Sequence, residues 1–190
     1  VLTATRALSR QMEPELGVSV PVLRNGYDAP RFERFTIRPV HSPDQPFRIL
    51  VHGLFGRLFD AETFLRLAAH CADHAPAHEF VLAGYGPTLS SVLEAKRPNI
   101  RYIGHVDQAG VLEALAAADL GLSVHRAEAR GSFPVKVFEF IGAGLPSIVF
   151  PRSEAGEEVQ SEGLGWTFDP EHWQDAAQLL SDLIRNPGRL

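Results

Sequence analysis

Short apolar runs alternate with helical stretches from residue 46 to residue 187, and this alternation is what most constrains the fold. The runs expected to form strands are residues 47–52, 80–83, 100–103, 120–124, 147–150 and 166–168. The stretches expected to form helices are residues 61–73, 89–93, 111–117, 132–143, a stretch after residue 150, and residues 172–184. Strands that alternate with helices are typical of parallel sheets, because parallel neighbours need a crossover connection. The sequence therefore predicts an α/β domain with a doubly wound parallel sheet.

Glycines follow the first three runs, at Gly53, at Gly84 with Gly86, and at Gly104. We expect them to end the strands and to give the backbone the freedom that tight turns need. In an open parallel sheet, ligands bind outside the carboxyl ends of the strands, near the point where the strand order reverses. The sequence therefore places a candidate site at the turns that follow these strands.

Residues 1–45 do not follow this alternation. Residues 3–16 are expected to contain a helix behind a strand, residues 20–23 a second short strand, and residues 24–28 a turn. The prolines expected to stiffen a linker are Pro39, Pro43 and Pro46. We interpret residues 1–45 as the end of another domain with its connection, and residues 46–187 as one doubly wound domain.

The composition argues against several classes of protein. With 190 residues, 45% of them hydrophobic, the chain can bury a substantial core. The net charge of −5 and the lack of a Lys or Arg cluster argue against a nucleic-acid partner, since affinity for the phosphate backbone comes from clustered cations. Cys71 is the single cysteine, which excludes intramolecular disulfides and favours a reducing compartment.

No stretch of the sequence is predicted to span a membrane. The longest apolar run, residues 138–150, is interrupted by Gly142, Gly144 and Pro146 and is too short for a bilayer. The first six residues lack the basic start and apolar core of a secretion signal. We therefore expect a cytoplasmic location.

The segment from Ser132 to Glu139 carries the clearest chemical pattern. Ser132 is expected to cap a helix, and Pro134 is tolerated in a first turn because its missing N–H would be unpaired there. Lys136 falls in the same turn. Free amide groups at a helix start attract anions, and an adjacent ammonium adds charge, so this pattern predicts a phosphate site.

Glu139 lies three residues after Lys136, on the same face of the predicted helix. A carboxylate behind a phosphate site is well placed to accept hydrogen bonds from sugar hydroxyls. The alternative is an ordinary surface pair of Lys136 and Glu139, which contributes about a few tenths of a kcal/mol. The spacing by itself favours neither interpretation.

Short motifs follow one another along the chain in a definite order. They are Asn25-Gly26-Tyr27-Asp28, Gly53 after the first strand, residues 83–87, residues 102–106, Ala118-Asp119-Leu120 and residues 138–146. This ordered set resembles the group-one retaining glycosyltransferases, and in particular the carboxyl-terminal, nucleotide-sugar-binding half of their GT-B fold, which is Rossmann-like. The resemblance covers nearly the whole chain, because residues 1–35 also look like the last strand, helix and connector that lead from the acceptor half.

The resemblance implies a retaining glycosyltransferase of the hexosyltransferase type that needs no metal and holds no permanent cofactor. Its donor substrate would be a nucleotide-diphosphate sugar, with the diphosphate at the helix after Ser132 and the ribose hydroxyls on Glu139. Helix amides and basic side chains would stabilise the leaving diphosphate. The donor-binding residues expected on these grounds are Gly53, Arg57, His105, Ser132, Phe133, Lys136 and Glu139, and no catalytic residue is assigned.

The resemblance also implies that the acceptor half is missing from this chain. The chain would then be incomplete for catalysis, and the acceptor would be bound by the missing half. Peripheral membrane association, where it occurs, would go through that half as well.

The chain departs from the family pattern at three positions. Gly131 stands where many members have an acid that contacts the transferred sugar, and Leu54 and Phe59 stand where members have an arginine and a lysine. Arg57 lies between these two and is either a diphosphate ligand or a surface arginine. His105 is likewise either a contact to the nucleotide base or a turn histidine.

Two other functions are compatible with the same fold. A nucleotide-sugar epimerase would need an acid–base pair acting on one sugar, and no such pair stands out. A noncatalytic binding or scaffold module is suggested by Gly131 and Leu54. Three histidines at four-residue spacing, beginning at His70, are interrupted by Pro76, so a solvated helix end is favoured over a metal site.

Overall fold

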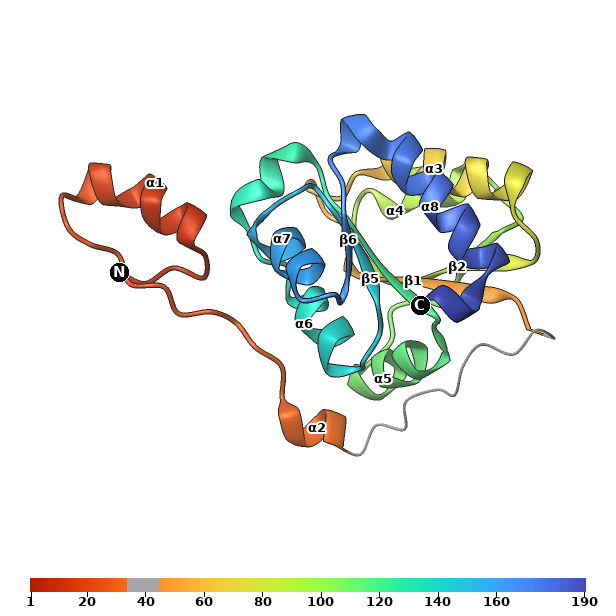
Figure 1. Cartoon of the computed structure of the whole chain (residues 1–190), viewed down its shortest axis with the longest axis horizontal. Helices are drawn as coiled ribbons and strands as arrows, with labels where there is room; N and C mark the ends of the chain where they lie inside the picture. The colour runs from red at the N-terminus through yellow and green to blue at the C-terminus, as the bar shows by residue number, and fades with distance from the viewer. Residues whose placement is uncertain (34–44) are drawn as a thin grey trace.

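The computed structural model describes residues 1–33 and 45–190, and within them a parallel sheet forms the centre of the fold (Figure 1). Its six strands have the order β3-β2-β1-β4-β5-β6. They are β1 (Phe47–Leu54), β2 (His78–Tyr85), β3 (Ile100–Tyr102), β4 (Leu120–Val124), β5 (Ser147–Phe150) and β6 (Gly165–Thr167). The chain adds strands outward from β1 and then crosses to its other side, so the order reverses between β1 and β4. The predicted doubly wound, Rossmann-like sheet is confirmed.

Helices cover both faces of this sheet. Those that flank it are α3 (Ala61–His74), α4 (Leu89–Glu94), α5 (Gln108–Ala117), α6 (Val135–Gly142), α7 (Glu154–Ser161) and α8 (Trp173–Arg185), whereas α1 (Arg6–Leu16) and α2 (Ala29–Glu33) belong to the amino-terminal segment. Residues of α3, α4 and α8, among them Phe64 and Leu180, join the core on one face. On the other face, Leu115 of α5 and Phe140 of α6 join a second core cluster, and α7 packs beside α6. The four central strands, β2, β1, β4 and β5, are mostly apolar and buried because both of their sides are covered.

The first two strands run two residues further than predicted, so Gly53 and Gly84 lie inside the sheet and pair with each other. Gly84 has a φ of +142°, and a Cβ atom there would lie 2.0 Å from the carbonyl oxygen of Gly53. The expectation that these glycines end the strands was wrong. Glycine is needed because the two backbones approach each other closely.

The amino-terminal segment, residues 1–33, contains α1 and α2 joined by extended chain. Of the two strands expected there, the structure has a single bridge between Thr3 and Val22. The hydroxyl of Thr5 caps α1 by accepting a hydrogen bond from the amide of Leu8 over 3.1 Å. The helix predicted within residues 3–16 is therefore confirmed as α1, which has about three turns.

This segment also contacts the sheet domain. The guanidinium of Arg24 pairs with Glu154 and Glu158 of α7, and Phe32 of α2 is buried in the core cluster of α5 and α6. The boundary at residues 45 and 46 stays a prediction, and the predicted linker prolines at positions 39 and 43 lie outside the described residues. No helix within residues 1–33 and 45–190 is long and apolar enough to cross a membrane.

Candidate functional site

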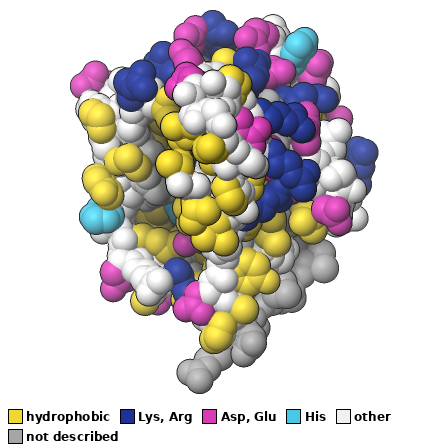
Figure 2. Space-filling model, turned by 90° about the vertical axis from the view of Figure 1, so that its left-hand side faces the viewer, with side chains coloured by type: hydrophobic (Ala, Val, Ile, Leu, Met, Phe, Trp, Pro, Cys, Tyr) yellow, Lys and Arg dark blue, Asp and Glu magenta, His cyan; other side chains and the backbone are white. Residues whose placement is uncertain are grey.

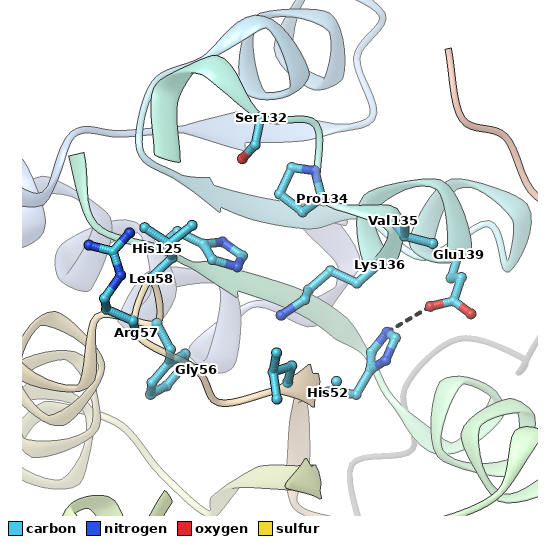
Figure 3. Close-up of a pocket in the computed structure, with 13 residues that line it drawn as sticks. His52, Gly56, Arg57, Leu58, His125, Ser132, Pro134, Val135, Lys136 and Glu139 are labelled. Atoms are coloured by element: carbon cyan, nitrogen blue, oxygen red, sulfur yellow. Dashed lines mark ion pairs between the residues drawn. The ribbon is translucent and has the colours of Figure 1, made fainter. Parts of the chain in front are cut away.

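A cleft of about 540 Å³ opens at the carboxyl ends of β1 and β4, where the strand order reverses (Figure 3). Its walls are the end of β1, the loop that follows β1, and the start of α6. The lining residues are His52, Gly53, Leu54, Gly56, Arg57, Leu58, Phe59, His125, Ser132, Pro134, Val135, Lys136 and Glu139. This is the edge at which an open parallel sheet binds its ligands.

The start of α6 differs from the expectation. Ser132 does not cap this helix, because its hydroxyl donates to the carbonyl of Ala129 over 2.8 Å and so closes the preceding short 3₁₀ helix, Ala127–Gly131. Pro134 occupies the cap position with extended backbone, and α6 begins at Val135. The predicted serine cap and first-turn proline were therefore wrong. The amide of Val137 donates to the carbonyl of Pro134 over 3.0 Å, whereas the amides of Val135 and Lys136 at the cleft wall are not capped by a serine oxygen.

Lys136 lies in the first turn of α6, as predicted, and its side chain extends into the cleft (Figure 3). A Cβ atom on Gly53 would lie 3.8 Å from its Nζ, so the ammonium sits against the backbone at the end of β1. Burial lowers the pKa of Lys136 to about 8, and the Glu139 carboxylate opposes that shift. The cleft therefore holds a half-buried cation beside a helix start.

Glu139 lines the cleft one turn further along α6. Its Oε2 lies 3.6 Å from Nε2 of His52, and its Oε1 lies 3.7 Å from a guanidinium nitrogen of Arg31. Burial raises the pKa of the Glu139 carboxyl, while Arg31 and Lys136 act in the opposite direction. Glu139 is thus bound into a buried polar cluster, which an ordinary surface pair with Lys136 does not describe.

Two histidines that sequence reasoning did not assign to the site also line the cleft. His52 is 4% exposed, and His125 follows β4 with its Nδ1 3.2 Å from the hydroxyl of Ser123. Burial, with the Lys136 charge as the next cause, lowers the pKa of both histidines to about 3. Both are therefore neutral at physiological pH. In the sequence, these two residues are indicated only by their position, because each is a histidine at the carboxyl end of an apolar run.

Arg31 is the third residue that sequence reasoning missed. It comes from α2, more than one hundred residues before Glu139. Its guanidinium also donates to the backbone carbonyl of Gln108 at the start of α5 over 3.2 Å. The connector segment therefore reaches the edge of the candidate site.

The cleft brings five of the seven predicted donor-binding residues together. These are Gly53, Arg57, Ser132, Lys136 and Glu139. His105 is exposed beside the ring of Tyr85, with 4.5 Å between ring centroids, and does not line the cleft. Phe133 is buried and stacks on Phe138 with 4.4 Å between centroids, so its side chain points away from the cleft. The donor-binding roles of all seven stay predictions.

Gly131 also lies outside the cleft lining. Its carbonyl accepts a hydrogen bond from the Thr5 hydroxyl over 2.7 Å, and a Cβ atom there would meet the side chain of Leu8 at 3.7 Å. The other two departures, Leu54 at the end of β1 and Phe59 in the following loop, both line the cleft; Leu54 is 57% exposed, whereas Phe59 is buried in the core. Within residues 1–33 and 45–190, no three His, Cys, Asp or Glu side chains are grouped in a way that could hold a metal ion.

Solved structures with the same fold cover nearly all of this chain. Anabaena HepE in complex with UDP matches 98% of the chain with a TM-score of 0.72 and 18% identity. A mutant of S. aureus TarM in complex with fondaparinux, alpha-GlcNAc-glycerol and UDP matches 98% with a TM-score of 0.74 and 13% identity. The chain spans 54% of the first structure and 37% of the second. These likenesses show the fold of one half of a GT-B glycosyltransferase.

Sequence comparison points the same way. A chitobiosyldiphosphodolichol beta-mannosyltransferase from Arthroderma benhamiae is 35% identical over 75 residues, which are 39% of this chain and 15% of that protein. The family model described as glycosyl transferases group 1 matches residues 47–186. Because this match covers more than two thirds of the chain and the whole of the sheet domain, the chain belongs to the group 1 glycosyltransferases.

Proposed function

We propose that this chain is the donor-binding half of a retaining, metal-independent hexosyltransferase, and that its cleft binds a nucleotide-diphosphate sugar. The observation that carries the proposal is the convergence of Lys136 and Glu139, from one turn of α6, on the cleft at the reversal of strand order. One side chain suits a diphosphate, and the other suits the hydroxyls of a ribose.

The diphosphate would lie at the start of α6. The amides of Val135 and Lys136, the Lys136 ammonium and the exposed guanidinium of Arg57 line this part of the cleft. As the bond to the sugar breaks, negative charge grows on the leaving diphosphate, and preorganised donors stabilise that charge. These groups would do so without a metal ion.

The ribose would lie beside Glu139, whose carboxylate would accept hydrogen bonds from its hydroxyls. The volume of about 540 Å³ lies within the ordinary range for small-molecule sites. HepE and TarM are described in complex with UDP, and the same class of nucleotide suits a cleft with two cations and one carboxylate.

Catalysis would need more protein than this chain holds. Figure 2 shows the side of the molecule on which α1 lies, where hydrophobic side chains are exposed. Within residues 1–23 the exposed large apolar residues are Val1, Leu2, Leu16, Val18, Val22 and Leu23. Apolar patches of this kind mark surfaces that another domain covers. We assign them to contact with an acceptor-binding half, which would bring the acceptor to the donor sugar.

The proposal is tested by calorimetric titration of the folded chain with UDP, GDP, ADP and their glucose and mannose derivatives. We expect saturable binding of at least one nucleotide, lost when Lys136 is replaced by Glu. An Arg66→Glu variant is the matched control, because Arg66 is an exposed cation on α3 that does not line the cleft. A folded chain that binds none of these nucleotides would contradict the donor-site proposal.

A noncatalytic nucleotide-sugar-binding module is the second candidate, favoured by Gly131, which leaves the contact to the transferred sugar unassigned. Both candidates predict nucleotide binding, so turnover must separate them. Addition of a separately expressed acceptor half to this chain should restore sugar transfer from the bound donor if the protein is an enzyme. Tight donor binding with no transfer by the complete protein would support the noncatalytic module.

A further inference from the structure

His52 is a buried residue of β1 whose imidazole enters the cleft. Its Nε2 has no hydrogen-bond partner among the described residues. The nearest acceptor is Oε2 of Glu139 at 3.6 Å, marked by the dashed line in Figure 3. A buried polar atom without a partner costs free energy, so such an atom at a ligand cleft indicates a role with the ligand bound.

Burial, assisted by the nearby cations, keeps the ring of His52 neutral. Lys136 and Glu139 face it from α6, and Arg31 faces it from α2. Burial lowers the pKa of His52 to about 3, and the Lys136 and Arg31 cations add to that shift. A neutral imidazole with a proton on Nε2 donates a hydrogen bond without neutralising the charge of its acceptor.

The ring of His52 is held in place from one side. It makes an edge contact with Phe140 of the same helix as Glu139, with 5.3 Å between ring centroids. The Glu139 carboxylate therefore has His52 on its Oε2 and Arg31 on its Oε1. A carboxylate has about four acceptor positions, so two remain for two neighbouring hydroxyls of a sugar.

We propose that His52 is a positioning residue that donates from Nε2 to Oε2 of Glu139, and that it thereby sets the preference of the site for ribose over deoxyribose nucleotides. The proposal rests on the function proposed above. The contact of 3.6 Å shortens to a hydrogen bond when a ligand closes the site, as hydrogen bonds of unliganded sites commonly do. Without His52, the carboxylate keeps its charge but loses its fixed direction.

The test compares UDP with 2′-deoxy-UDP by calorimetry, with the GDP and ADP pairs measured in parallel. For the wild-type chain we expect the ribose form to bind about tenfold more tightly, the ratio that one hydrogen bond to a charged acceptor supplies. In His52→Leu this ratio should fall below about twofold. In His52→Gln the amide nitrogen takes the place of Nε2, and most of the preference should return.

A second buried histidine provides the control. His78 is 9% exposed, lies at the start of β2 and does not line the cleft, so His78→Leu should leave the preference unchanged. Thermal unfolding of each variant establishes that it is folded, and the leucine fills the space that alanine would leave empty.

The outcomes separate this inference from the proposed function. If the folded wild-type chain binds no nucleotide, the proposed function fails. If it binds nucleotides but shows no preference for ribose, or if His52→Leu keeps the preference, the role of His52 fails alone. Equal loss in the leucine and glutamine variants also contradicts the role, because ring shape rather than the Nε2 donor would then set the preference.

Discussion

His52 and His78 are both buried and lie on neighbouring parallel strands, β1 and β2, but at opposite ends of them. His52 lies near the carboxyl ends of the strands, which we call the carboxyl edge, and His78 lies at their amino ends, the amino edge. His78 is fully hydrogen-bonded: its Nδ1 donates to the carbonyl of Pro76 over 2.7 Å, and its Nε2 accepts from the amide of Asn99 over 2.8 Å. His52 has an unpaired Nε2 that faces a cleft. A histidine at the amino edge therefore links segments of the fold by hydrogen bonds, whereas a histidine at the carboxyl edge keeps a ring nitrogen available to a ligand.

The amino edge of the sheet shows the same use of other polar groups. Asn99 also donates to the carbonyl of Ala68 over 2.8 Å, which ties β3 to α3. The carboxylate of Asp119 accepts from the amide of Arg48 over 2.7 Å, at the start of β4 and β1. Asp119 therefore has a structural role at the turn from α5 into β4. These polar groups at the amino edge stabilise the fold, whereas Lys136 and Glu139 at the carboxyl edge line the cleft to which we assign a ligand.

The largest expected effect is a loss of stability in acid, caused by the buried histidines at the carboxyl edge. Between pH 6.5 and about 3, the unfolded chain binds protons on His52 and His125 that the folded chain excludes, so the free energy of unfolding falls as the pH falls. Each histidine contributes a slope of up to about 1.4 kcal/mol per pH unit. Urea unfolding at pH 7, 6, 5 and 4 measures how the free energy of unfolding depends on pH.

His52→Gln is the matched variant, because glutamine keeps a polar nitrogen but does not titrate. Its free energy of unfolding should fall less steeply than that of the wild type over the same range. Parallel curves for the two proteins would show that His52 is not kept neutral by its surroundings.

Replacing Glu139 by Ala should have the next largest effect, on binding rather than on stability. The ribose hydroxyls would lose their acceptor, so the affinity for UDP should fall by about 1–3 kcal/mol, which is roughly 5- to 150-fold. The free energy of unfolding should change little, because Glu139 is held in the cleft at the expense of its own solvation. Calorimetry and urea unfolding measure the two quantities, and an unchanged dissociation constant would contradict the ribose role.

The order of strands and helices was predictable because the four central strands, β2, β1, β4 and β5, are buried along most of their length and read as apolar runs. Lys136 and Glu139 were predictable because they share one turn of one helix, so local spacing places both at the same cleft. The serine cap failed because Ser132 serves the end of a 3₁₀ helix, and the local sequence does not distinguish that end from the start of α6.

The remaining site residues depend on contacts between distant parts of the chain. Arg31 reaches Glu139 across the docking of α2 on α6, which no local pattern encodes. His52 was not predicted as a site residue, because it lies at the end of an apolar run that the sequence indicates only as a strand. The resemblance suggests a contact between His105 and the nucleotide base, but His105 follows β3, which lies two positions from β1, and it does not line the cleft.

The His78→Ala variant should show the opposite behaviour to Glu139→Ala. Removal of the imidazole leaves the Asn99 amide without one of its acceptors, so the free energy of unfolding should fall by about 2 kcal/mol. The affinity for UDP should stay the same within about twofold, because His78 lies at the amino edge. Urea unfolding and calorimetry of this one variant therefore test both halves of the difference between the edges. A clear loss of affinity would mean that the amino edge also supports the ligand site.

The smallest expected effect is the pH dependence that Lys136 gives to diphosphate binding. Burial holds the pKa of Lys136 at about 8 in the free protein, and a bound diphosphate would raise it by placing negative charge beside the ammonium. Binding then takes up a proton above pH 8, so the affinity for UDP should be level below pH 8 and fall by less than about tenfold from pH 8 to pH 9. A Lys136→Met variant should bind more weakly, with an affinity that is level over the same range. A decline of the same size in the variant would assign the titration to another group, and Lys136 would then remain charged throughout, like an exposed lysine.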